Sequence, residues 1–294
     1  MYHPNDKECT FPRLCAHRGY NKAAPENTLP AFALAVSMGA QEIELDLWPN
    51  KDGDLVVCHD SSVTRTSDGK GLISEMTTKE IKALDAGGWF SPVYKGIKMP
   101  LFEEVLDLFG GKVITNIHIK SPARKVKMCE QMIRRGRELS ENYNKDAVIM
   151  PPLPLYNGEI LPENDPSQII PYSEKDLLHI LQLLDSYHCR DYAYICGEAD
   201  VLYAAQQAAP DIPRCCLEGH MNYTIVDHAI RYDCKKLTFS KGFTTQEMVE
   251  KAHAHGITCN IFWSDDAKEA KAFFDAGIDC VLTNNYQLTS FALI

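Results

Sequence analysis

The chain has 294 residues, a formal net charge of −10 and a hydrophobic fraction of 45%. This average composition excludes disordered and fibrous proteins, and the acidic balance without a long basic run disfavours nucleic-acid binding. We find no run of 18 apolar residues and no signal-peptide core, so we expect no transmembrane segment. The sequence therefore predicts a soluble, cytoplasmic protein that acts on a small molecule.

Eleven cysteines are a high count for this length. Their number is odd and their spacing irregular, without a Cys-x-x-Cys pair and with only Cys215 and Cys216 adjacent. Such a pattern disfavours both a disulfide framework and a zinc site. We interpret the cysteines as reduced thiols, mostly in buried strands.

Short β-rich apolar runs alternate with amphipathic stretches along the whole chain. In chain order, we expect strands at 14–19, 42–48, 113–120, 192–196, 213–218, 235–240, 257–263 and 279–283. We expect helices between them, at 29–38, 102–109, 125–142 with 175–188, 199–208, 224–232, 245–255 and 267–276. Alternating strands and helices indicate a parallel sheet with crossover helices. Eight such units in a chain of this length predict an α/β fold, a closed (β/α)8 TIM barrel.

Two segments do not follow the repeat. Residues 49–111 are too long for an ordinary connection after the second strand, and residues 143–172 are proline-rich and irregular. We interpret residues 1–294 as one barrel domain with an insertion after strand two. We expect the insertion to form part of a site and assign no role to the second segment.

Chemically reactive side chains stand where the expected strands end. The first strand ends in His17 and Arg18, the second carries Glu44 and Asp46, and the third carries His118 and Lys120. Trp263 ends the seventh. The active sites of barrels lie at the carboxyl ends of their strands, so we expect these residues to meet there.

The sequence also predicts a cation at this place. Glu44 and Asp46 are two residues apart, about 6.7 Å in a strand, and so share one face. Carboxylates buried together cost free energy unless a cation balances them. Oxygen ligands favour Mg²⁺ or Ca²⁺, whereas a nitrogen from His118 favours Zn²⁺ or Mn²⁺. We expect Glu42, at the start of the same strand, to meet a basic residue nearer the barrel floor.

A hairpin signal supplies a second histidine. If Asp52 and Gly53 are the two turn residues, His59 lies opposite Asp46 and beside the cation. One cation, two histidines, an arginine and a lysine suit phosphate chemistry, because the imidazoles can transfer protons while the positive groups stabilise phosphoryl oxygens. No glycine-rich nucleotide loop occurs, so phosphoester cleavage is the natural candidate.

Four stretches, in this order and spacing, resemble the glycerophosphodiester phosphodiesterases: CAHRGYNKAAPENTLPAF, GAQEIELDLWPNKDGDLVVCHD, LDAGGWFSPVYKGIKMPLFEEVL and NIHIK. The resemblance implies a TIM barrel that hydrolyses glycerophosphodiesters to glycerol 3-phosphate and an alcohol with a divalent cation. In the mechanism usually proposed for this family, the glycerol 2-hydroxyl attacks phosphorus to give a cyclic phosphate, which water then opens.

The resemblance also implies a role for each matching residue. His17 and His59 would be the acid and base pair, Arg18 and Lys120 would hold the phosphate, and Trp263 would pack against glycerol. Glu44 and Asp46 would bind the metal. Asn27 and Thr28 would cap the first helix, with Glu26 shaping the loop before it.

The sequence departs from the family pattern at two places. His118 stands where a glutamate usually provides the third metal ligand, and Asn284 follows strand eight where Thr-Asp-x-Pro is common. Three interpretations stay open: His118 binds a softer ion, Glu218 replaces the missing acid, or the site binds weakly and turns over little. The alternatives to the phosphodiesterase are thus a degenerate barrel that binds a phosphorylated ligand, and a phospholipase-like relative. The second is disfavoured because no lysine-rich amphipathic helix for membrane docking is visible.

Overall fold

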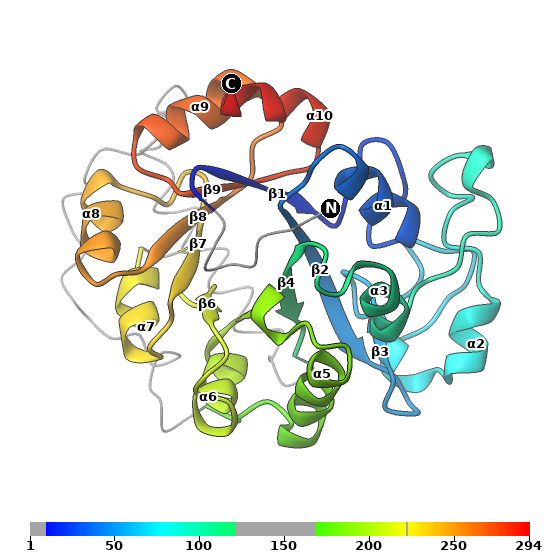
Figure 1. Ribbon diagram of the computed structural model, residues 1–294. Helices are drawn as coiled ribbons and strands as arrows, with labels where there is room; N and C mark the ends of the chain where they lie inside the picture. The colour runs from blue at the N-terminus through cyan, green and yellow to red at the C-terminus, as the bar shows by residue number, and fades with distance from the viewer. Residues whose placement is uncertain (1–9, 122–168, 222) are drawn as a thin grey trace.

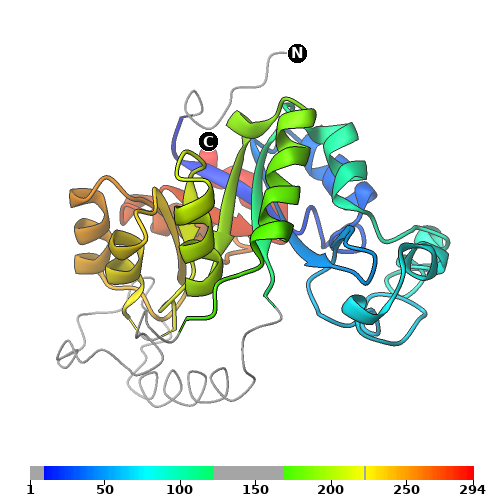
Figure 2. The ribbon, with the colours of Figure 1, turned by 90° about the horizontal axis from the view of Figure 1, so that it is seen from below.

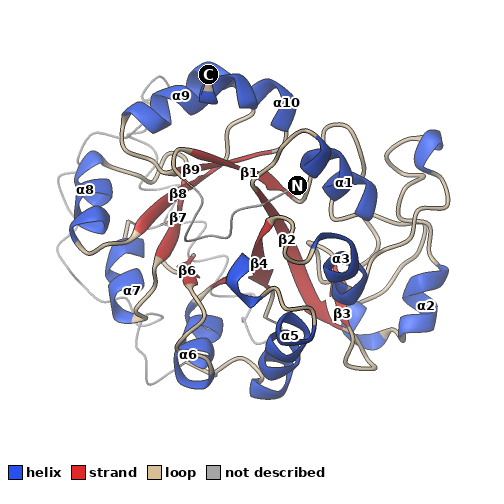
Figure 3. Ribbon diagram, in the orientation of Figure 1, coloured by secondary structure: helices blue, strands red, loops and turns tan. Residues whose placement is uncertain are grey.

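The computed structural model describes residues 10–121, 169–221 and 223–294. Eight parallel strands form a closed barrel with the helices outside it (Figures 1 and 3). Strand β1 pairs with both β2 and β9, which closes the sheet. The predicted TIM barrel and its eight strands are confirmed. The barrel strands are β1 (Arg13–His17), β2 (Glu42–Pro49), β4 (Ile114–Ile119), β5 (Ala193–Gly197), β6 (Arg214–Cys216), β7 (Lys236–Ser240), β8 (Thr258–Phe262) and β9 (Cys280–Thr283).

The helices cover the outer face of the barrel. Outward-facing residues of the strands, such as Ile43, Leu45 and Ile117, join the apolar helix faces in one large core. The predicted helix at 125–142 and most of the irregular segment 143–172 lie outside the described residues. Among the described helices, none has both the length and the apolar character needed to cross a bilayer. They are α1 (Leu29–Ser37), α2 (Thr78–Ala83), α3 (Phe102–Phe109), α5 (Glu174–Ser186), α6 (Ala199–Ala208), α7 (Ile225–Arg231), α8 (Gln246–Ala254), α9 (Ala267–Asp275) and α10 (Tyr286–Thr289).

The insertion projects to one side of the barrel (Figure 2). It contains β3 (Leu55–Val57), which pairs antiparallel with β2, and then α2 between two short 3-10 helices, Ile73–Glu75 and Pro92–Tyr94. A small apolar cluster of its own, including Val63 and Ile81, holds it together. The Tyr94 hydroxyl donates to the carbonyl of Ala23 at 2.7 Å, which ties the insertion to the loop after β1.

The predicted register of the hairpin is wrong by one position. Asn50 Oδ1 accepts hydrogen bonds from the backbone N–H groups of Asp52 (2.9 Å) and Asp54 (2.8 Å), so the turn is wider than two residues. As a consequence Cys58, and not His59, donates its N–H to the carbonyl of Asp46, at 3.0 Å. His59 follows directly in the loop after β3.

Glu42 meets a basic partner inside the barrel, as predicted. Its carboxylate lies 3.6 Å from Arg13 Nη1 and also accepts a hydrogen bond from the Tyr194 hydroxyl. Arg13 and Glu42 are both almost completely buried. An ion pair in this position neutralises two charges that water cannot reach.

We expect Arg13→Met to lower the free energy of unfolding by about 3–5 kcal/mol, because it leaves the buried Glu42 carboxylate without its cation. The double variant Arg13→Met/Glu42→Gln removes both charges, so its free energy of unfolding should fall clearly less. Urea denaturation monitored by circular dichroism measures both values. Equal losses in the single and double variants would show that packing, and not the unpaired charge, sets the cost.

The nine described cysteines are all buried and unpaired, in agreement with the sequence analysis. Several lie in barrel strands, including Cys15, Cys215 and Cys280. Burial raises the pKa of the Cys15 and Cys280 thiols well above their usual value. These thiols are therefore protonated packing groups.

Candidate active site

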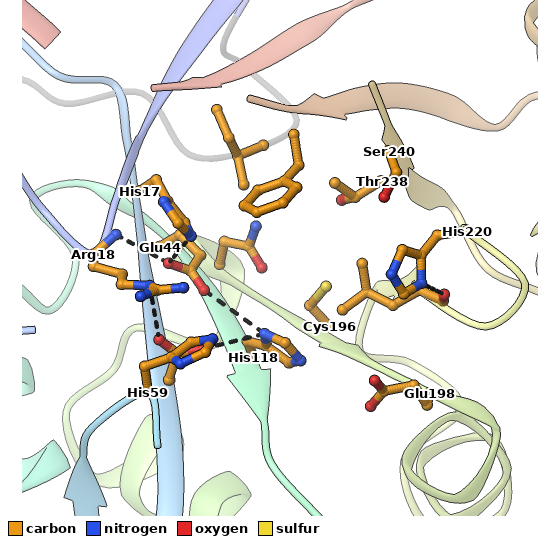
Figure 4. A pocket seen from close by; sticks show the side chains of 15 residues that line it. His17, Arg18, Glu44, His59, His118, Cys196, Glu198, His220, Thr238 and Ser240 are labelled. Carbon is orange, nitrogen blue, oxygen red and sulfur yellow. Dashed lines mark hydrogen bonds and ion pairs between the residues drawn. The ribbon is translucent and has the colours of Figure 1, made fainter. Parts of the chain in front are cut away.

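A cavity of about 200 Å³ opens at the carboxyl ends of the barrel strands. Figure 4 shows that carboxylate and imidazole side chains from β1, β2, β4 and the loop after β3 gather on one side of it, whereas Glu198 and His220 lie on the other. Six of the eight predicted site residues line this cavity: His17, Arg18, Glu44, Asp46, His59 and His118. The other two, Lys120 and Trp263, lie next to lining residues.

Glu44, Asp46 and His118 form one cluster of potential metal ligands. One ligand atom from each of the three lies within 4.8 Å of the others. His118 Nδ1 is 3.2 Å from Asp46 Oδ1 and 3.8 Å from Glu44 Oε1. The register explains this convergence, because β2 and β4 are parallel with Asp46 directly beside His118, and period-two alternation turns Glu44 the same way.

The electrostatics of this cluster favour a cation. Burial and the neighbouring Asp46 raise the pKa of Glu44 to about 8. Burial opposes ionisation of Asp46 too, but the Lys120 ammonium and a hydrogen bond from His118 hold its pKa well below the usual value. Lys120 Nζ lies 2.9 Å from Asp46 Oδ1 and 3.0 Å from His118 Nδ1. The cluster thus already attracts one positive charge.

The donor set suits a divalent cation of borderline softness. Burial and the Lys120 ammonium lower the pKa of His118, so the neutral imidazole that metal binding requires predominates at pH 7. Two carboxylates and one imidazole nitrogen are ligands for Zn²⁺ or Mn²⁺ as well as for harder ions. Glu218 does not complete the cluster. It accepts a hydrogen bond from the N–H of Ala199 at 3.1 Å instead.

His17 is held in one tautomer by the end of the last strand. Its Nδ1 lies 2.8 Å from Asn284 Oδ1, an oxygen that also accepts from Asn21 Nδ2 at 2.7 Å. Since that oxygen can only accept, His17 Nδ1 donates and Nε2 keeps its lone pair. Burial and the nearby Arg18 lower the pKa of His17 to about 4. His17 is therefore a neutral imidazole whose Nε2, 3.9 Å from Glu44 Oε2, can accept a proton.

His59 is held by its neighbour in sequence. Its Nδ1 lies 2.7 Å from Asp60 Oδ1, and Trp48 Nε1 donates to its backbone carbonyl at 3.2 Å. Burial lowers the pKa of His59, although the charge of Asp46 works in the opposite direction. The carboxylate of Asp60 fixes Nδ1 as the donor, which leaves Nε2 for chemistry.

Arg18 lies in a strained turn between the first strand and the first helix. Its φ of 55° lies in the left-handed region, and Gly19 follows with φ of 78°. A Cβ on Gly19 would lie 2.6 Å from the backbone carbon of Ala31, so only glycine fits. The turn directs the N–H of Arg18 to Glu44 Oε2 at 3.0 Å, and its Nη1 to Glu26 Oε1 at 2.9 Å.

Thr28 stands at the N-cap of α1, as predicted, but neither its side chain nor that of Asn27 caps the helix. The Thr28 hydroxyl donates to the carbonyl of Pro25 at 2.6 Å. Asn27 Nδ2 donates to Asp46 Oδ2 at 2.8 Å. Both side chains hold the loop in place, and Asn27 joins it to the ligand cluster.

Trp263 follows β8 and is 44% exposed, packed against Phe262 with 4.9 Å between ring centroids. Phe262 itself lines the cavity and packs its edge against the His17 ring. Phe262 carries no polar side-chain atom and was not predicted as a site residue. Asn116 was not predicted either, although the alternation along β4 places it on the same face as His118. Asn116 Oδ1 is buried and has no hydrogen-bond partner among the described residues.

A second group of potential ligands lies at the opposite ends of the strands. His253, Cys259 and Asp279 meet near the amino ends of β8 and β9. Asp279 Oδ2 already accepts from the N–H of Cys259 at 2.7 Å and lies 2.9 Å from His253 Nε2. Burial raises the pKa of the Cys259 thiol, which disfavours the thiolate that a metal needs. This group is a structural contact.

Comparisons with known proteins agree with this geometry. Over 109 residues the chain is 48% identical to a glycerophosphodiester phosphodiesterase of Caldanaerobacter subterraneus, covering 37% of this chain and 45% of that protein. It is 43% identical over 155 residues to one of Bacillus subtilis, covering 46% and 53%. The chain thus spans about half the length of the curated relatives it matches.

Solved structures extend the likeness over nearly the whole chain. An Oleispira antarctica phosphodiesterase in complex with the product sn-glycerol-3-phosphate superimposes with a TM-score of 0.71 at 23% identity, covering 96% of this chain and 97% of that one. A glycerophosphodiester phosphodiesterase from Agrobacterium tumefaciens gives a TM-score of 0.68 at 21% identity, covering 97% and 100%. The family model for glycerophosphoryl diester phosphodiesterases matches residues 17–288. The cavity that His17, His59 and the ligand cluster line thus lies in a chain that belongs to the glycerophosphoryl diester phosphodiesterase family.

Proposed function

We propose that this protein hydrolyses glycerophosphodiesters to glycerol 3-phosphate and an alcohol, with His17 and His59 as the proton-transfer pair. The observation that carries the proposal is the placement of two imidazoles, each fixed through Nδ1, beside one cavity that also holds the carboxylate and imidazole cluster. Proton transfer by a positioned imidazole typically contributes about 10²- to 10⁴-fold to a rate.

The side chains divide the reaction between them. Arg18 and Lys120 hold the phosphoryl oxygens, as positive groups at the edge of the cavity. The free Nε2 of His17 accepts the proton of an attacking hydroxyl. His59, starting as the imidazolium that the charge of Asp46 and the hydrogen bond to Asp60 favour, donates its Nε2 proton to the leaving alcohol oxygen and becomes neutral. Attack by the glycerol 2-hydroxyl would give a cyclic phosphate, which water opens through the same pair in reversed roles. Trp263 and Phe262 form the apolar wall for glycerol.

Glu44, Asp46 and His118 would hold a divalent cation, and the bound ion would supply positive charge opposite the phosphoryl oxygens. Family resemblance favours Mg²⁺ or Ca²⁺, whereas His118 favours Zn²⁺ or Mn²⁺. The buried, unpaired thiols are typical of a reducing compartment, which supports the proposed cytoplasmic location.

The test begins with protein treated with a chelator and then supplied with Mg²⁺, Ca²⁺, Mn²⁺ or Zn²⁺ in turn. Glycerophosphocholine and glycerophosphoethanolamine are the substrates, and released glycerol 3-phosphate is the readout. We expect turnover with at least one ion. If no ion supports turnover while inorganic phosphate still binds, the chain is a binding protein with a degenerate site, the alternative that His118 raises.

His118→Glu should shift the preferred ion toward Mg²⁺ or Ca²⁺. A carboxylate oxygen replaces the imidazole nitrogen, so the affinity ratio of Mn²⁺ over Mg²⁺ should fall at least about tenfold, equivalent to 1.4 kcal/mol. Isothermal titration calorimetry on the metal-depleted protein measures both affinities without a substrate. An unchanged ratio would remove His118 from the ligand set.

A further inference from the structure

Arg65 lies outside the cavity, yet it connects two of the side chains that the proposed reaction needs. It belongs to the insertion, in the loop between β3 and the 3-10 helix Ile73–Glu75. Its guanidinium makes a pair of hydrogen bonds to each of two carboxylates. On Asp60 the distances are 2.6 Å from Nε and 3.2 Å from Nη2, and on Glu26 both are 2.8 Å.

Each of these carboxylates in turn touches a residue that lines the cavity. Asp60 Oδ1 lies 2.7 Å from His59 Nδ1, and Glu26 Oε1 lies 2.9 Å from Arg18 Nη1. The contacts therefore form one continuous chain from His59 through Arg65 to Arg18. Planar, two-pronged binding of a carboxylate fixes orientation as well as distance, which a single charge does not do.

The architecture explains why such a link is needed. Arg18 and Glu26 lie in the loop after β1, whose position the barrel sets directly. His59 and Asp60 follow β3, a strand of three residues outside the closed barrel that pairs with β2 and forms one further bridge, between Val56 and Leu101. The hydrogen bond from Trp48 Nε1 holds the backbone of His59, and Tyr94 ties the insertion to Ala23, but neither contact reaches the side chains of His59 and Arg18.

The pKa values of the two carboxylates agree with this geometry. Partial burial works against ionisation of Asp60, but hydrogen bonds from Arg65 and His59 lower its pKa to about 2. Hydrogen bonds from Arg65 and the charge of Arg18 likewise outweigh burial and lower the pKa of Glu26. Both carboxylates are thus ionised acceptors at neutral pH. Ion pairs at exposed positions usually add little to stability, and Arg65 is 44% exposed.

We propose that Arg65 is a positioning residue, which fixes His59 and Arg18 relative to each other across the cavity by holding Asp60 and Glu26. The proposal rests on the proposed function, because it assigns Arg65 to the geometry of that reaction. Removal of Arg65 should therefore slow turnover and barely change the free energy of unfolding.

The test compares Arg65→Ala and Arg65→Lys with a matched control, Arg190→Ala. Arg190 also bridges two carboxylates, Asp185 and Asp211, but it precedes β5 at the end of the barrel away from the cavity. We expect Arg65→Ala to lower kcat about 10- to 100-fold, the size of a small misplacement of catalytic groups, while Arg190→Ala keeps the wild-type kcat. Arg65→Lys should recover only part of the loss, because an ammonium cannot donate a pair of hydrogen bonds to each of the two carboxylates.

Two further measurements separate positioning from folding. Guanidinium ions, at concentrations far below those that unfold proteins, should restore part of the kcat of Arg65→Ala, whereas ammonium ions should not. A kcat of Arg65→Ala within twofold of the wild type, or a loss that Arg190→Ala reproduces, would overturn the proposal. Backbone amide hydrogen exchange should become faster in residues 18–28 and 57–66 of Arg65→Ala, and not in those of Arg190→Ala.

The exchange measurement needs no substrate. If the wild-type chain turns over no glycerophosphodiester, the proposed function fails, and exchange still decides whether Arg65 holds the two loops. Unchanged exchange in both loops would overturn the link even in an active enzyme.

Discussion

His17→Ala and His59→Ala should each lower kcat/KM for glycerophosphoethanolamine by about 10²- to 10⁴-fold, since each removes one partner of a proton transfer. His17 offers a free Nε2 because Asn284 holds its Nδ1–H, and His59 is fixed in the same way by Asp60. The readout is the initial rate of glycerol 3-phosphate release, measured with the best ion. If the two act in one proton-transfer sequence, the double variant should lose less than the product of the two single losses.

The matched control is His255→Ala. His255 is exposed at the end of α8, and its Nδ1 contacts the carbonyl of Lys251, away from the cavity and its ligand cluster. This variant should keep the wild-type rate. Each inactive variant must also bind metal as the wild type does, because a loss of metal binding would point to a disturbed cluster. A His59→Ala protein that retains more than about a tenth of the activity would rule out His59 as a proton-transfer group.

Asp46→Asn is the second large effect. It keeps the shape of the side chain but removes the charge that Lys120 contacts at 2.9 Å and that Asn27 Nδ2 contacts at 2.8 Å. The variant replaces an ionised ligand with a neutral one, so the affinity for a divalent cation should fall at least about 100-fold, or 2.7 kcal/mol. Calorimetric titration of the metal-depleted protein gives this value directly.

Asp279→Asn is the control for the place of the ion. Asp279 belongs to the other group of potential ligands, with His253 and Cys259. We expect this variant to bind the cation as tightly as the wild type. Should Asp279→Asn lose the ion while Asp46→Asn keeps it, the assignment of the metal site to the cavity is wrong.

Local sequence rules predict the part of the site that lies within strands. The period of two turns Glu44 and Asp46 to one face and His118 to the same face of the next strand, and β2 and β4 confirm this arrangement. Glu42 follows the same rule two residues before Glu44, closer to the barrel floor, where it meets Arg13. Strand and helix alternation was sufficient to predict the barrel because each unit repeats the same simple pattern.

Loops follow no such period, and there the predictions were wrong or missing. The hairpin register depends on Asn50, whose side chain widens the turn by binding two N–H groups. Asn27 serves Asp46 and not the helix beside it. The contacts of Arg65 with Glu26 join residues 39 positions apart in sequence, so only the relative placement of two loops in space brings them together. The six-residue α2 was missed because it lies inside the long insertion.

The hydrogen bond between His17 and Asn284 spans 267 positions of the sequence. It joins the first strand of the cylinder to the residue after the last one, so the imidazole acquires its working tautomer only when the sheet has closed on itself. A form in which β9 has separated from β1 would carry every residue of the ligand cluster, Glu44, Asp46 and His118, but would lack the hydrogen bond that fixes His17. The orientation of the His17 ring thus depends on closure of the barrel between β9 and β1.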